Sequence, residues 1–69
     1  LILYRVMPDD DENVVQDELE NCRRILRSGG EILVCHERDS KVPGYLKKIF
    51  DDVEVKRREV NYQVSACVK

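Results

Sequence analysis

The sequence predicts an α/β fold with the element order βαβαββ, in which two parallel strands are followed by an antiparallel hairpin. Two apolar runs of strand length, residues 1–6 and 31–36, flank a segment with helical periodicity. The last part of the chain alternates apolar and polar residues, which is typical of strands with one buried face. Together these observations place the chain in the α/β class.

The first strand and the first helix have clear boundary signals. Residues 1–6 are nearly continuous in apolar strand formers, as in a strand covered on both faces, and Pro8 ends them. The acids of residues 9–12 suit a helix N-terminus, which offers free amide donors, so the helix should begin near Asp9 or Asp10. Ser28-Gly29-Gly30 should stop it, because glycine accepts the left-handed conformation. The apolar positions that give this helix one buried face are Val14, Val15, Leu19, Cys22, Ile25 and Leu26.

The second half of the chain repeats the pattern and then changes it. Residues 31–36 form a second buried strand, which should be parallel to the first because a helix joins the two. Pro43 opens a short second helix that should end near Asp51-Asp52. Residues 53–56 and 60–68 then alternate and should pair antiparallel, with the connection near residues 57–59. One face of the last strand contains Val60, Tyr62, Val64, Ala66 and Val68, and we expect Tyr62 to lie in the core with the rest of that face.

Composition narrows the class of protein. A chain of 69 residues with net charge −2, 42% hydrophobic and 38% charged residues fits a single globular domain, here residues 1–69. There is no overall basic excess for a nucleic acid to attract. No apolar run approaches the roughly 18 residues of a membrane span, so we expect no membrane partner and a cytoplasmic location. The three cysteines stand singly without Cys-x-x-Cys spacing, which indicates buried reduced thiols.

The size of the chain and its first residues suggest a partial domain. A chain this short buries only about 60% of its unfolded surface, so its core is thin and a partner surface becomes relevant. Leu1 starts directly inside an apolar run, as an excised piece would. We therefore expect residues 1–69 to be part of a larger fold.

Two stretches resemble the class I S-adenosylmethionine-dependent methyltransferases, and the resemblance covers the whole chain. Residues 22–34, CRRILRSGGEILV, look like the helix, Gly-Gly turn and fifth strand of that Rossmann-like family. Residues 45–55, YLKKIFDDVEV, followed by Asn61-Tyr62-Gln63-Val64, are similar to the ending of ribosomal RNA guanine methyltransferases. The resemblance implies the C-terminal half of the domain, strands four to seven, with strand seven antiparallel.

The resemblance also implies where the chemistry would lie. In the family, S-adenosylmethionine lies over the first three strands on a glycine-rich turn, and this sequence has no Gly-x-Gly before a helix, so no cofactor is expected on this chain alone. The loop after strand four lines the methyl-transfer site, and it corresponds to residues 4–9. Many nucleobase-modifying members have a polar residue followed by Pro-Pro there, whereas this chain has Arg5-Val6-Met7-Pro8-Asp9. The candidates are Arg5, Met7, Pro8 and Asp9 for catalysis, and Tyr4 and Arg5 for the cofactor.

Other residues have a functional and a structural interpretation. Cys35, His36 and Glu37 end the second strand, at the edge where open α/β sheets bind ligands, so His36 and Glu37 are substrate candidates; packing and solvation are the alternative. Cys35 and His36 point to opposite faces and cannot form a nucleophile and base pair. The acids of residues 9–12 suit Mg²⁺, but helix capping is the favoured interpretation, and no metal site is predicted.

Basic and aromatic side chains also have both a functional and a structural interpretation. Arg23, Arg24 and Arg27, with Lys47 and Lys48, suit an RNA phosphate patch, while solvated helix faces explain them equally well. Tyr45 and Tyr62 have the rings to stack on a base, although the alternating face around Tyr62 favours a core position.

Two hypotheses about function remain. The first is the substrate-side half of an S-adenosylmethionine-dependent methyltransferase domain, inactive alone, with the missing N-terminal half as its partner. The second is a non-catalytic α/β module that associates through an exposed strand edge. Both predict a second chain, either the missing half or another copy in a dimer, paired along residues 1–6, because an unpaired apolar strand favours association.

Overall fold

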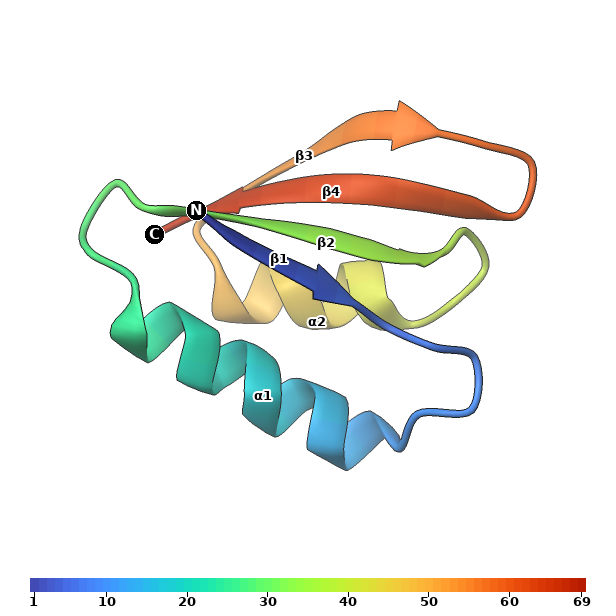
Figure 1. Cartoon of the computed structure of the whole chain (residues 1–69), viewed down its shortest axis with the longest axis horizontal. Coiled ribbons are helices and arrows are strands. Elements are labelled where there is room, and N and C mark those ends of the chain that lie inside the picture. Colours follow the sequence, from blue (N-terminus) through green and yellow to red (C-terminus); the bar gives the residue numbers. More distant parts are fainter.

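The computed structural model describes all 69 residues and has the predicted βαβαββ order. The elements are β1 (Ile2–Arg5), α1 (Glu12–Ile25), β2 (Glu31–Glu37), α2 (Val42–Ile49), β3 (Asp52–Arg58) and β4 (Tyr62–Val68). They form one four-stranded sheet in the order β1-β2-β4-β3, with β1 and β2 parallel and β4 antiparallel to both of its neighbours (Figure 1). The predicted parallel pair and the predicted antiparallel hairpin are therefore both confirmed.

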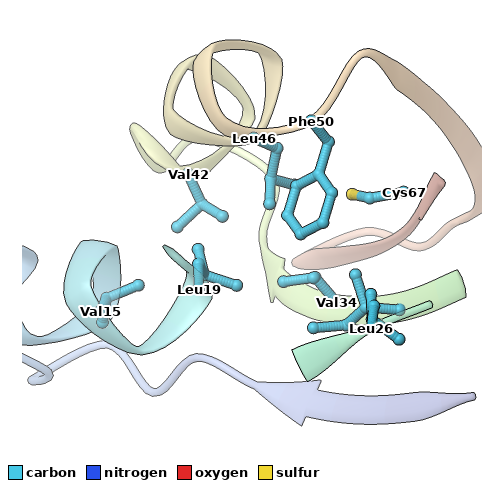
Figure 2. Packing of buried hydrophobic residues seen from close by; sticks show 9 residues of the cluster. Val15, Leu19, Leu26, Val34, Val42, Leu46, Phe50 and Cys67 are labelled. Atoms are coloured by element: carbon cyan, nitrogen blue, oxygen red, sulfur yellow. The ribbon is translucent and has the colours of Figure 1, made fainter. Parts of the chain in front are cut away.

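Both helices lie on the same face of the sheet (Figure 1). The core lies between the sheet and the two helices. Leu19 of α1, Ile32 of β2 and Leu46 of α2 are completely shielded from solvent. Figure 2 shows the ring of Phe50 beside the Cys67 sulfur, where the end of α2 packs on β4. The core is a single cluster, as expected for a small two-layer domain.

The opposite face of the sheet has no helix over it and is called the open face below. Strand register assigns its residues, because paired residues point to the same side of a sheet. Leu3 pairs with Leu33, and Cys35 pairs with Val64, whereas the neighbouring Ile32 and Val34 point toward the helices. Leu3 is 73% exposed. The expectation that residues 1–6 are covered on both faces is wrong for this chain, in which only one face is covered.

The register of β4 also corrects the expected position of Tyr62. Val64, Ala66 and Tyr62 do share one face, but it is the open face, and Tyr62 is 42% exposed. The face of β4 toward the helices carries Gln63, Ser65 and Cys67, all buried. Alternation identified the two faces correctly but could not indicate which of them the helices cover.

The ends of α1 differ from the prediction by a few residues. Asp11 is the N-cap, so the helix begins at Glu12 and not near Asp9 or Asp10. The earlier acid, Asp10, instead closes the preceding loop by accepting a hydrogen bond from the Met7 N–H at 2.8 Å. At the other end, the helix stops at Ile25, before the glycines, because Leu26 is extended and turns its side chain into the core.

The glycine turn then connects α1 to β2. Gly29 has φ 83°, the left-handed conformation expected for this pair. A Cβ at Gly30 would lie 2.8 Å from the Arg27 carbonyl oxygen, so only glycine fits there.

The boundaries of the second half also shift. Helix α2 begins at Val42, with Pro43 in its first turn, and ends at Ile49, not near Asp51-Asp52, because Phe50 leaves the helix to enter the core. Strand β3 continues to Arg58, so the hairpin connection is residues 59–61 and not 57–59. The strand extends because a register shift between Val55 and Arg57 lets pairing with β4 resume beyond it. No helix is long and apolar enough to cross a membrane.

Candidate active site

The carboxyl ends of β1 and β2 lie at one edge of the sheet, where each strand continues into a loop that leads to a helix. The Val6 N–H donates to the Cys35 carbonyl at 2.8 Å, so pairing with β2 continues one residue past β1. The loop then turns back, because the Asp10 N–H donates to the Met7 carbonyl at 3.1 Å. Open α/β sheets bind ligands at this edge. The structure places the loop of residues 6–10 in the centre of it.

A cavity of about 290 Å³ lies between this loop and the loop after β2. Its lining includes Val6, Met7 and Pro8 on one side and Ser40 and Lys41 on the other. Lys41 is the one cation in its lining. Four acids also line it: Asp10, Glu12, Glu37 and Asp39. This first cavity is therefore acidic, and a phosphate would be repelled from it.

A second cavity, of about 410 Å³, lies on the other side of the same loop, toward the open face. Arg5 of β1, Cys35 of β2 and Tyr62 of β4 line it, and their side chains point away from the helices. Val6, Met7, Pro8 and Glu37 line both cavities, so the loop after β1 is the wall between them. Of the catalytic candidates, Arg5, Met7 and Pro8 line the second cavity, whereas Asp9 lines neither.

His36 is 1% exposed and has both ring nitrogens engaged. Its Nδ1 lies 2.8 Å from the Glu37 carbonyl oxygen, which only accepts, so this nitrogen donates. In the neutral ring, Nε2 then accepts from the Ser65 hydroxyl at 3.1 Å. The Ser40 hydroxyl donates to the same Glu37 carbonyl at 2.8 Å. The imidazole thus holds the loop after β2 in position, and Cys35 faces the opposite side of the sheet.

The two cofactor candidates diverge. Tyr4 points toward the helices, and its hydroxyl donates to the Glu18 carboxylate of α1. Burial, then this hydrogen bond and the charge of Glu18, raise the pKa of Tyr4 well above its ordinary value. Arg5 points to the open face and lines the second cavity. Both residues also line a third cavity, of about 290 Å³, beside the start of α1. Their cofactor role stays a prediction.

The acids that precede α1 act in helix formation. Asp11 Oδ1 accepts from the Asn13 N–H at 2.8 Å and the Val14 N–H at 3.4 Å, which confirms the capping interpretation. Glu12 lies 3.6 Å from the Lys41 ammonium, an exposed ion pair between the N-terminal ends of α1 and α2. His, Cys, Asp and Glu side chains come together nowhere in groups of three or more that suit a metal ion.

Asn61 was not a predicted site residue, yet it lines the second cavity beside Tyr62. The Arg38 N–H donates to the Asn61 carbonyl at 3.2 Å, which ties the β3–β4 connection to the loop after β2. An antiparallel partner of β2 must begin where β2 ends. The predicted hairpin put residues 57–59 in the turn and Asn61 in the strand, so only the observed pairing of β4 with β2 brings Asn61 to the site.

The four-stranded mixed sheet with both helices on one face is that of a partial Rossmann-like methyltransferase fold. The comparison with family models agrees, with a match to the methyltransferase small domain over residues 4–66. The chain belongs to this family.

A solved structure gives the same fold in a larger protein. The 16S rRNA methyltransferase RsmC of T. thermophilus, in complex with AdoMet and guanosine, superposes with a TM-score of 0.83 at 24% sequence identity. The match covers 97% of this chain but 19% of that protein. No curated protein sequence matches the chain. The chain thus spans about a fifth of the length of that methyltransferase.

Proposed function

We propose that this chain is the substrate-side half of an S-adenosylmethionine-dependent methyltransferase domain that acts on a guanine base in ribosomal RNA. The family match supports methyl transfer, and the structural neighbour, which holds AdoMet and guanosine, supports the substrate class. The chain by itself is inactive, because it has no glycine-rich turn before a helix to hold the cofactor. Its three free cysteines suit a reducing compartment such as the cytoplasm.

The observation that carries the proposal is the bare open face beside the second cavity. Leu3 and Leu33 give this face apolar side chains, and β1 is an edge strand with no neighbour on its outer side. A covering layer over Leu3 would also close the second cavity, because the residues that line it reach it from the same face. The partner expected there is the N-terminal half of the domain, paired along residues 1–6.

The residues at the cavity suggest how the chain would contribute to the reaction. S-adenosylmethionine supplies the methyl group when it is bound, and the chain offers one wall of the reaction centre. Met7 and Pro8 present an apolar surface that excludes water, while Arg5 and Glu37 provide charges to orient a polar base. His36 acts as a positioning residue, because its ring holds the Glu37 carbonyl.

Calorimetric titration with S-adenosylmethionine tests the proposal. Residues 1–69 alone should give no heat of binding, while a polypeptide extended at its N-terminus should bind. In the extended form, Glu37→Gln should lower methyl transfer to ribosomal RNA, whereas the exposed Glu54→Gln on the far strand should leave it unchanged. Absence of cofactor binding by the extended polypeptide would refute the proposed function.

A second candidate is a non-catalytic module that associates through β1. The exposed fractions of Leu1, 80%, and Leu3, 73%, on an unpaired edge strand favour it. Residues 1–69 should then sediment as a dimer at tens of micromolar, and Leu3→Lys should make them monomeric without unfolding. A stable dimer whose extended form never binds S-adenosylmethionine would favour this candidate over methyl transfer.

A further inference from the structure

The groove between α1 and α2 is a basic surface in an acidic chain. It has a volume of about 600 Å³. Its lining residues are Gln16, Glu20, Arg23, Arg24, Tyr45, Lys48, Ile49 and Lys69. Four cations thus meet one acid here, although the whole chain has net charge −2. The residues come from α1, from α2 and from Lys69 just after β4, so only the fold brings them together.

The cations of this groove form no ion pairs with acids of the chain. The three ion pairs of the structure involve Lys41, Lys56 and Arg57, none of which lines the groove. The Nε of Arg23 is buried and has no hydrogen-bond partner. A buried guanidinium donor without an acceptor is costly, and no ion pair of the chain neutralises the charge of this guanidinium at the groove.

Completion of the α1 dipole explains only part of this arrangement. The Lys69 ammonium donates to the Leu26 carbonyl at 2.8 Å, which serves the C-terminus of α1. Arg24 donates to the Asn21 side chain on the same helix. Neither contact neutralises a charge, because both acceptors are neutral, and Lys48 belongs to another helix. The positive charge of the groove therefore remains available to an external anion.

Tyr45 connects the groove to the candidate active site. Its side chain lines both the groove and the first cavity, at the N-terminal half of α2. The acidic first cavity repels phosphates, so a nucleic acid whose base reaches the sheet edge needs a basic path for its backbone elsewhere. The groove is lined by Tyr45, Lys48 and Ile49 of α2 and by residues of α1.

We propose that this groove binds the phosphate backbone of the RNA strand whose base is methylated at the sheet edge. The inference rests on the proposed function and adds a second contact region to it. Its contacts are electrostatic and go to phosphates, so they position the strand without reading its sequence. Arg23, Arg24 and Lys48 supply the charge, and Tyr45 offers a ring at the end nearest the site.

RNA binding by the polypeptide extended at its N-terminus tests the proposal. Fluorescence anisotropy measures the affinity for single-stranded RNAs of unrelated sequence over a range of salt concentrations. Arg24→Glu and Lys48→Glu should each weaken binding to every RNA. Each should also reduce the slope of log affinity against log salt by about one. Lys47→Glu is the matched control, because Lys47 is exposed on the same helix but does not line the groove.

Three outcomes would overturn the inference. Equal effects of Lys47→Glu and Lys48→Glu would show a general charge effect, and unchanged salt slopes would show that the groove makes no phosphate contact. Polyglutamate that binds as tightly as RNA, with the same loss in the variants, would assign the groove to an acidic protein. Calorimetry with S-adenosylmethionine on the same variants should show unchanged cofactor affinity. Loss of RNA binding with retained cofactor binding therefore separates this inference from the proposed function.

Discussion

The two faces of the sheet differ in the side chains that they carry, as strand β4 shows. Toward the helices, β4 presents Gln63, Ser65 and Cys67, and all three are buried. Toward the open face, the same strand presents Val64 and Ala66, next to Leu33 of β2. The buried polar groups therefore lie under the helices, while the open face combines apolar side chains with charged ones such as Arg5 and Glu54.

This contrast is a difference between a face that the helices cover and one that no helix covers (Figure 1). Polar groups are tolerated inside when their hydrogen bonds are satisfied, as Ser65 is by His36. The exposed side chain of Leu3 contributes little to stability until another layer removes it from water. The covered face therefore stabilises this chain, and under the proposed function the open face is where the rest of the domain would pack.

Truncation of a leucine on each face should give the largest difference. Leu19→Ala, at a completely buried position, should lower the free energy of unfolding by about 2–5 kcal/mol. Leu3→Ala should change it by less than about 0.5 kcal/mol in residues 1–69, because that side chain is 73% exposed. Urea unfolding measures both. In a polypeptide with the open face covered, Leu3→Ala should become clearly destabilising; equal costs in residues 1–69 would contradict the two-face description.

The cysteines of the two faces should differ in alkaline solution. Burial, and then the charge of Glu31, raise the pKa of the Cys67 thiol from 9.0 to about 11. The unfolded chain loses this proton first, so the stabilisation is complete below pH 9 and is lost as the pH rises to about 11. The loss amounts to about 2–3 kcal/mol. Cys67→Ala should flatten the decline of unfolding free energy over that range.

Cys35→Ala is the matched control for this experiment, because Cys35 pairs across β2 and β4 on the open face. It should leave the alkaline decline as steep as in the unmodified chain. A decline that is equally flat in both variants would show that the decline does not come from the covered thiol.

The buried polar pair should give the smallest effect. Ser65→Ala leaves Nε2 of His36 buried without a partner and should cost about 1–3 kcal/mol. Adding His36→Leu to Ser65→Ala removes the orphaned nitrogen, so the double variant should lose less stability than the sum of the single variants. A double-mutant cycle by urea unfolding measures this coupling. Strict additivity would mean that the two side chains do not depend on each other.

Much of the fold could be predicted because its signals are local. Periodicity distinguished strands from helices, Gly29 marked the turn, and the acids before α1 marked its start. Boundaries failed where tertiary packing decided them. Leu26 and Phe50 leave their helices early because their side chains enter the core, and no local preference encodes that exit.

The candidate site could be located but not resolved from the sequence. The sheet edge follows from strand order, and the family resemblance placed the loop of residues 4–9 there; residues 6–8 of that loop line both cavities. Strand register and distant partners decide the rest. They bury His36 and bring Asn61 to the second cavity, and they turn the side chains of Tyr4 and Arg5 to opposite faces of the sheet.

By itself, the sequence determined the types of elements, their order and the parallel and antiparallel pairing, because backbone propensity, capping and crossover connections act over short distances. Tertiary structure decided which face of each strand the helices cover and which cations meet between α1 and α2. Alternation gives every strand two faces but labels neither, and only packing against a second layer makes the choice.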